Sequence, residues 1–183
     1  PTAVNQSIKA IPSVIQSGIG LYIHIPWCEK KCPYCDFTAH ALPVAHQLDP
    51  DLETRYLNQL LHDLDKDIET FGIAAELTSL FFGGGTPSLL SSRGLGFLLA
   101  EINKRLPITK TTECTLEANP GSSDHAKFVG YRAAGINRLS IGVQSFSDTA
   151  LQQLGRTHTR SDASDAIQAA RRAGFSNINL DLM

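Results

Sequence analysis

Four stretches of the chain alternate between aliphatic and polar residues, the period-two pattern of strands that face two different environments. They span residues 20–25, 112–118, 138–144 and 177–183. Their aliphatic residues are suited to packing under helices. Their polar residues include Tyr22, His24, Glu117, Gln144 and Asp181. Because unpaired polar groups are costly to bury, we predict that these polar residues line an inner face that holds a polar ligand.

Helical patterns alternate with these strands. Residues 77–82 are predicted to form one more strand, in which the adjacent Phe81 and Phe82 interrupt the alternation. Helices are predicted over residues 51–70, 91–105, 123–134, 147–155 and 161–174, the third with a serine cap and the last three closed by glycine. The segments FVGYRAAGINRLSIGVQ and IQAARRAGFSNINLDLM resemble each other, each being a helix followed by a strand.

Strand and helix alternate at a spacing typical of parallel βα units. We therefore predict an α/β fold, a partial TIM-type (βα) barrel of parallel strands. A complete barrel of eight units needs about 250 residues. The chain has 183 residues and five predicted strands, so a barrel truncated after the fifth strand is expected. Residues 1–19 are predicted to form an irregular N-terminal tail, and residues 20–183 the core.

Composition narrows the class of protein. Apolar residues make up 42% of the chain and charged residues 19%, which is ordinary for a globular protein. A net charge of −2 gives no basic footprint for nucleic acid. No apolar run is long enough to span a bilayer, and the start of the chain lacks the pattern of a secretory signal. We therefore predict a cytoplasmic protein with no transmembrane segment and no nucleic-acid partner.

The main chemical signal is a cluster of cysteines directly after the first strand. Cys28, Cys32 and Cys35 follow the spacing C-x3-C-x2-C. In parallel α/β folds, ligand sites lie beyond the carboxyl ends of the strands. Three thiolates in a compact loop suit an iron–sulfur cluster with one open iron. Zinc is the alternative, with His24 or His40 as the fourth ligand, although no second cysteine knuckle follows.

A glycine-rich turn, GGGTP at residues 83–87, follows the second strand. It lacks the Lys-Ser/Thr pair that ends a Walker-type phosphate-binding loop, so a phosphate site is weakly supported. Glycines would instead let the bare backbone approach a ligand. A merely tight turn is the alternative.

The cysteine spacing, with the aromatic Tyr34 before the last cysteine, resembles the signature of the radical S-adenosylmethionine (SAM) superfamily. This resemblance implies a [4Fe–4S] cluster on Cys28, Cys32 and Cys35, whose open iron takes the amino and carboxylate groups of SAM. It also implies reductive cleavage of SAM to a 5'-deoxyadenosyl radical, which needs a reductant for the cluster. Cys114 lies on the aliphatic side of its strand and is expected to be structural.

Six further stretches are similar to one branch of the superfamily, the coproporphyrinogen oxidase-like proteins (HemN/HemW): YIHIPWC, GGGTP, LEANPG, SIGVQSF, GRTH and NLDLM. The resemblance implies SAM contacts at matching positions. Tyr22 and Tyr34 would lie by the cluster, and Gly84, Gly85 and Thr86 by the methionyl group. Glu117 and Gln144 would contact the ribose, Arg156 the carboxylate, and Asp181 the nucleoside.

The branch contains two functions. Its oxygen-independent coproporphyrinogen III oxidases, which form protoporphyrinogen IX, carry a further cysteine at the position of Phe37. They also carry a longer N-terminal extension. Phe37 therefore favours the HemW type, a haem chaperone that binds haem for haem-accepting proteins, with oxidase activity as the alternative. On this resemblance the partner is haem or a porphyrinogen, and whether the protein is an enzyme stays open.

Overall fold

The computed structural model describes residues 18–42 and 48–183. The side chains of residues 122–126 also lie outside the described part. Most of the predicted tail, residues 1–19, is therefore not covered. The same holds for the side chain of His125, which the sequence predicts to lie at the surface.

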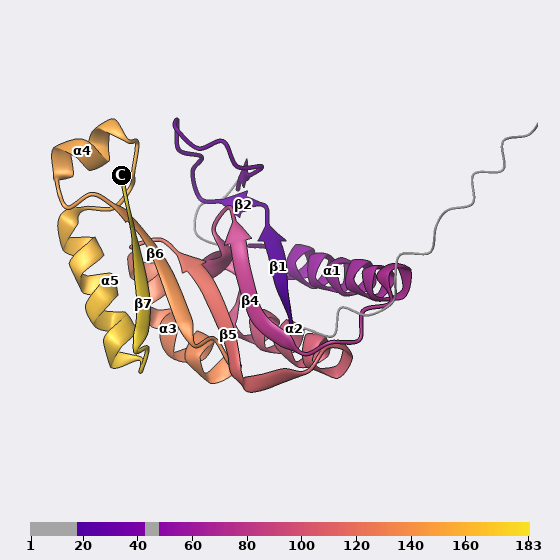
Figure 1. Ribbon diagram of the computed structural model, residues 1–183. Helices are drawn as coiled ribbons and strands as arrows, with labels where there is room; N and C mark the ends of the chain where they lie inside the picture. The colour runs from indigo at the N-terminus through magenta and orange to yellow at the C-terminus, as the bar shows by residue number, and fades with distance from the viewer. Residues whose placement is uncertain (1–17, 43–47) are drawn as a thin grey trace, which may run out of the picture.

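Five parallel strands form the main sheet (Figure 1). They are β1 (Ile19–Ile25), β4 (Leu77–Gly84), β5 (Ile108–Ala118), β6 (Arg138–Gln144) and β7 (Asn177–Leu182). Their order in the sheet is the order of the chain, without the reversal that marks doubly wound folds. Each strand is added beside the one before it, as in a βα barrel, which confirms the predicted parallel α/β core.

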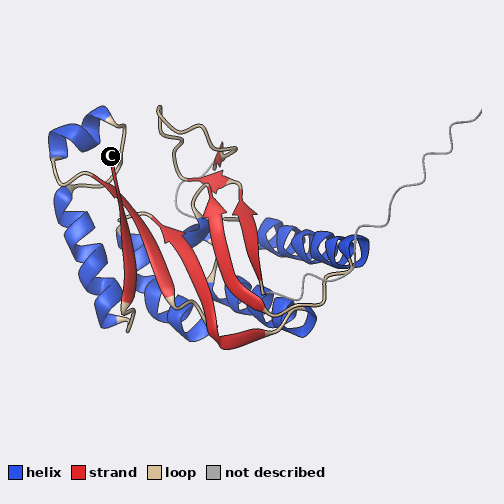
Figure 2. Cartoon of the chain, viewed as in Figure 1, coloured by secondary structure: helices blue, strands red, loops and turns tan. Residues whose placement is uncertain are grey.

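Four longer helices connect the strands: α1 (Pro50–Phe71), α2 (Ser92–Arg105), α3 (Ser122–Ala134) and α5 (Arg160–Arg172). Consecutive helices pack against one another, and α2, α3 and α5 cover one face of the sheet (Figure 2). That face carries the aliphatic residues of the strands. Leu80, Phe82, Leu116, Leu139 and Ile141 are completely buried there.

β4 alternates as well, although its sequence does not suggest it. Leu80 and Phe82 face the helices, whereas Phe81 lies half-buried on the opposite face. There the Phe81 ring stacks on the ring of Tyr22, with 6.2 Å between the centroids. An aromatic residue thus takes a position on the inner face that polar residues occupy on the other strands.

Each of the five predicted helices begins within one residue of its predicted start. Gly121 stands at the N-cap of α3 with no side-chain cap bond, so the predicted serine cap is wrong. α5 begins one residue earlier than predicted, because Thr159 and Asp162 form a reciprocal capping box. α1 begins as expected behind Asp49, whose carboxylate accepts the backbone N–H of Leu52 at 2.8 Å.

Short elements shape the carboxyl edge of the sheet. β2 (Trp27–Cys28) pairs with β3 (His40–Ala41), which closes the cysteine loop at its base. A 3-10 turn, η1 (Pro87–Leu89), follows the glycine turn, and α4 (Asp148–Gln153) follows β6. The cysteine loop and α4 both lie at the end of the sheet where the strands finish (Figure 1).

None of the helices in the described ranges is long and apolar enough to cross a membrane.

Candidate functional site

A pocket opens between the cysteine loop and the carboxyl ends of β4 to β7. All the predicted site residues except Tyr22 line it: Cys28, Cys32, Tyr34, Cys35, Gly84, Gly85, Thr86, Glu117, Gln144, Arg156 and Asp181. They come from segments far apart in the chain. The pocket therefore brings together, in one place, residues that the sequence offers as separate motifs.

The three loop cysteines are free and partly exposed. In the described part of the chain, no three His, Cys, Asp or Glu side chains converge on a point that could hold one metal ion. Three cysteine thiolates in one loop are donors of the kind that hold an iron–sulfur cluster.

His24, one of the two histidines proposed for zinc, is engaged in other contacts. His24 Nε2 lies 2.8 Å from the carbonyl oxygen of Thr38, and its Nδ1 lies 3.1 Å from the hydroxyl of Tyr22. Both ring nitrogens are thus engaged in hydrogen bonds, as expected for a residue that does not ligate. His40 lies exposed on β3.

Tyr22 lies on the inner side of the edge strand, outside the lining of the pocket. Its side chain is more than half exposed. Burial and the nearby carboxylate of Glu117 raise the pKa of its hydroxyl. Tyr22 is therefore held beside the site through His24 and Phe81.

The glycine turn brings bare backbone against the base of the cysteine loop. The backbone N–H of Gly85 donates to Ile25 O, and that of Thr86 donates to Trp27 O, both at 2.7 Å. Gly84 has a φ of 113°, a conformation that favours glycine. A Cβ at Gly84 would also meet the ring of His24. The turn thus fixes β4 to the segment that leads into Cys28.

Gly85→Ala is expected to destabilise the fold by about 2–3 kcal/mol, since overpacking forces the backbone to shift. Its Cβ would lie no farther than 3.0 Å from three backbone atoms of Trp27 and Ile25. Gly96→Ala is the matched control, because its Cβ would meet Ala134 at an ordinary 3.7 Å within α2. We expect that control to be neutral or stabilising. Urea denaturation measures both, and equal losses would contradict the account.

Arg156 is the cation of the pocket. Its Nη2 donates to Asn119 Oδ1 at 2.6 Å and to Gly142 O at 2.8 Å, and its Nη1 lies 3.5 Å from Cys32 Sγ. Its Nε is buried and has no hydrogen-bond partner. A buried unpaired donor is costly, so it indicates an acceptor from a ligand. A carboxylate beside the cysteine loop would meet this need.

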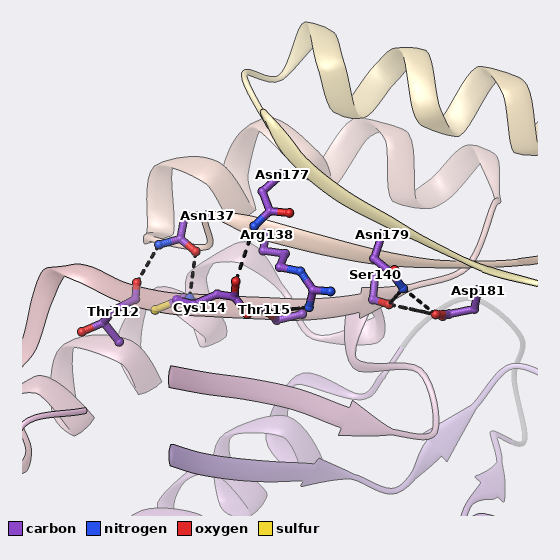
Figure 3. Close-up of polar contacts among 10 residues, drawn as sticks. Thr112, Cys114, Thr115, Asn137, Arg138, Ser140, Asn177, Asn179 and Asp181 are labelled. Carbon is purple, nitrogen blue, oxygen red and sulfur yellow. Dashed lines mark hydrogen bonds and ion pairs between the residues drawn. The ribbon is translucent and has the colours of Figure 1, made fainter. Parts of the chain in front are cut away.

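Two carboxylates line the pocket, one from β5 and one from β7. Glu117 accepts the backbone N–H of Gly84 at 3.2 Å. Asp181 accepts from Asn179 Nδ2 at 2.7 Å and from the hydroxyl of Ser140 at 3.2 Å (Figure 3). Burial, with a smaller contribution from the charge of Asp181, raises the pKa of Glu117 to about 7, although the Gly84 N–H opposes the shift. Glu117 therefore titrates near neutral pH before any ligand is bound.

This pKa predicts a pH dependence of stability in the cluster-free protein. Between about pH 4.5 and about pH 7 the folded protein keeps a proton on Glu117 that the unfolded chain has released, so stability falls as pH rises through this range. Glu117→Gln removes this contribution. The free energy of unfolding of the variant, relative to that of the wild type, should therefore increase as the pH is raised from about 5 to about 8, as measured by urea denaturation. Parallel curves would contradict the raised pKa.

Gln144 ends β6 in the left-handed region, with a φ of 63°. It is the one non-glycine residue with a positive φ in the described part of the chain. Such strain persists where the surrounding structure fixes it. The backbone carbonyl of Gln144 accepts the N–H of Met183 at 2.9 Å. A Cβ on the neighbouring Gly142 would lie 3.2 Å from Gln144 Nε2, so the glycine makes room for the amide.

Polar side chains continue along the inner face away from the pocket (Figure 3). Arg138 donates to the hydroxyl of Thr115 at 3.2 Å and lies 3.8 Å from the carboxylate of Glu113, to which Asn177 donates at 3.4 Å. Asn137 instead bonds the backbone of β5 at Thr112 and Cys114, both at 2.8 Å. Away from the pocket, the polar side chains of the inner face thus form hydrogen bonds and an ion pair with one another.

Sequence reasoning missed Asn119 and Ser140, and it gave no role to His158. Asn119 belongs to the LEANPG stretch, yet an asparagine before proline is typical of a turn. His158 is buried and lies 3.0 Å from Val143 O through Nε2. Burial lowers its pKa. It therefore holds the loop that carries Arg156 against the end of β6.

Cys114 lies apart from this site, as predicted. It is buried on the aliphatic side of β5, and burial raises its pKa to about 11. The thiol is therefore kept protonated and unsuited to bind a metal.

Comparison with known proteins agrees with the geometry. A haem chaperone HemW from Haemophilus influenzae is 46% identical over 168 residues, which cover 90% of this chain and 43% of that protein. HemW from Escherichia coli is 47% identical over 167 residues, 90% of this chain and 42% of that protein. A mitochondrial radical S-adenosyl methionine domain-containing protein 1 from Bos taurus is 38% identical over 163 residues, 89% of this chain and 35% of that protein. The chain thus spans 35–43% of the length of these relatives.

Among solved structures, coproporphyrinogen III oxidase (HemN) from Escherichia coli, a radical SAM enzyme, superposes with a TM-score of 0.80 at 25% identity. The match covers 94% of this chain and 38% of that one. The model of the Radical SAM superfamily matches residues 22–183, which include the cysteine loop and the whole pocket. Proteins of this superfamily in general use SAM and a [4Fe–4S] cluster. This chain belongs to the radical SAM superfamily.

Proposed function

We propose that the chain forms the cluster- and SAM-binding part of a haem chaperone of the HemW kind. The observation that carries the proposal is Phe37, which lines the pocket and has 63% of its surface exposed. In the oxidases that the chain resembles, a further cysteine stands at this position. Relatives named haem chaperone HemW at 46% and 47% identity support the same function.

Cys28, Cys32 and Cys35 would hold the cluster, and SAM would occupy the pocket beside it. Arg156 would bind the carboxylate of SAM, which is supported by its unpaired Nε. Gly84, Gly85 and Thr86 would bind the methionyl group, since the turn presents bare backbone there. Glu117, Gln144 and Asp181 would contact the ribose and the nucleoside. Tyr34 and Tyr22 would flank the cluster.

When bound, the cluster supplies the electron for reductive cleavage of SAM. The chain itself contributes orientation and charge. Arg156 fixes one end of the ligand and lies against Cys32. Glu117 is held by the Gly84 N–H, so the carboxylate stays aimed at the pocket. Thr86 hydrogen-bonds the Cys28 thiol and thereby opposes the rise in the pKa of Cys28 that burial causes.

The partners under this proposal are haem, haem-accepting proteins and a reductant for the cluster. We place the protein in the cytoplasm, a reducing compartment that keeps thiolates available to a metal. Oxygen-independent coproporphyrinogen III oxidase activity is the second candidate. HemN from Escherichia coli, which superposes on this chain, is the reason to test it, although the relatives named haem chaperone HemW do not favour it.

The test uses the full-length protein, reconstituted anaerobically with iron and sulfide. It is incubated with coproporphyrinogen III, SAM and a reductant, and in parallel it is titrated with haem. We expect haem binding at a defined stoichiometry and no decarboxylated product. Conversion to protoporphyrinogen IX would establish the oxidase instead. A protein that binds no haem and makes no product would leave neither function standing.

A further inference from the structure

A chain of hydrogen bonds joins two cluster cysteines by way of Asn119. Asn119 Nδ2 donates to the hydroxyl oxygen of Thr86 at 3.1 Å, and Asn119 Oδ1 accepts from Arg156 Nη2 at 2.6 Å. Thr86 in turn hydrogen-bonds the Cys28 thiol. At the other end, Arg156 Nη1 lies 3.5 Å from Cys32 Sγ. The order is therefore Cys28, Thr86, Asn119, Arg156, Cys32.

The orientation of the Asn119 amide decides where the Thr86 proton goes. Because the Thr86 oxygen accepts from Asn119, its own proton is left to donate to the sulfur of Cys28. A flipped amide would offer its oxygen to Thr86 and draw that proton away. It would also turn an NH2 group toward the guanidinium of Arg156. Arg156 therefore fixes the amide orientation in which the Thr86 hydroxyl can donate its proton to the sulfur of Cys28.

The same contact fixes Arg156. Its Nη2 is held between Asn119 Oδ1 and Gly142 O, which leaves Nη1 facing Cys32 and Nε unpaired. Without the Asn119 oxygen, one of the two anchors of Nη2 is lost. Asn119 thus positions a donor at each of two cysteine sulfurs, through Thr86 at Cys28 and through Arg156 at Cys32.

We propose that Asn119 is a positioning residue that sets the reduction potential of the cluster and the affinity for SAM by orienting Thr86 and Arg156. The inference rests on the proposed cluster and SAM site. Hydrogen bonds to the sulfurs stabilise the reduced, more negative cluster, so their loss lowers its potential. A less firmly fixed Arg156 binds the SAM carboxylate more weakly.

The experiment compares wild type, Asn119→Ala and Thr86→Val in the reconstituted full-length protein. Redox titration followed by EPR gives the midpoint potential, and calorimetry gives the dissociation constant of SAM. We expect Asn119→Ala to shift the potential to a more negative value and to weaken SAM binding about tenfold. Thr86→Val should lower the potential too. In the Thr86→Val background, Asn119→Ala should lower the potential by less than it does in the wild-type background.

Asn103→Ala is the matched control. Its amide oxygen accepts the backbone N–H of Ile108 at 2.7 Å at the opposite end of β5, so it should change neither the potential nor the SAM affinity. Asn119→Ser, which keeps a turn-forming residue before Pro120, replaces the alanine variant if that variant fails to fold. A wild type that forms a cluster and binds SAM, with an Asn119 variant unchanged in both, overturns this inference alone. A wild type that forms no cluster overturns the proposed function as well.

Discussion

Cys32→Ala is expected to leave the protein unable to hold a [4Fe–4S] cluster. The proposed cluster has only three thiolate ligands, Cys28, Cys32 and Cys35, so this substitution leaves two. His24 is committed to Thr38 and Tyr22 through both ring nitrogens. Iron and sulfide content and the visible absorption after anaerobic reconstitution should fall to near background.

Cys114→Ala is the control for that substitution. It also removes one thiol, but this thiol is buried on the aliphatic side of β5 with a pKa of about 11. We expect the control to keep its full iron content and to lose only a small part of its stability, in proportion to the atom removed. Retention of the cluster in Cys32→Ala, or its loss in Cys114→Ala, would refute the assignment of ligands.

Arg156→Lys is expected to weaken SAM binding by roughly 30-fold, or about 2 kcal/mol, because a charge-assisted hydrogen bond and its planar geometry are lost. Lysine keeps the positive charge but has one nitrogen in place of three. It cannot reach Asn119, Gly142 and Cys32 while offering a further donor where Nε lies unpaired. Calorimetric titration of the reconstituted protein with SAM measures the effect.

Arg105→Lys is the matched control for the arginine substitution. Arg105 pairs with Asp65 and Glu101 on the outer surface, away from the pocket, so its loss should leave SAM binding unchanged. Equal affinity of Arg156→Lys and wild type would contradict the assignment of Arg156 to the SAM carboxylate.

The alternating strands made the parallel core and its two faces predictable from the sequence. In β6, Leu139 and Ile141 face the helices and Ser140 faces inward, as their order along the strand requires. The alternation of β4 could not be read from its sequence, because Phe81 and Phe82 are both apolar. Only the structure shows that they lie on different faces, with Phe81 packed on Tyr22. Two-residue strands such as β2 and β3 are too short to carry any periodicity.

The site could be predicted where a residue carried a recognisable motif, and was missed where its role depends on contacts across the fold. The cysteine spacing and the glycine turn are local signals in the sequence. The residues of both motifs line the pocket. Asn119 acts through hydrogen bonds to Thr86 and Arg156, and His158 acts through one to Val143. None of these partners is close in the sequence to the residue that it contacts. A single sequence does not show those pairs.

The most direct test of the account is whether SAM reaches the cluster in this pocket. The reconstituted full-length protein is reduced, and its EPR spectrum is recorded before and after SAM is added. The account predicts a [4Fe–4S] signal that changes on addition of SAM in the wild type and changes much less in Arg156→Lys at the same concentration. A spectrum that SAM leaves unaltered in the wild type would contradict the claim that three cysteines leave one iron open to SAM.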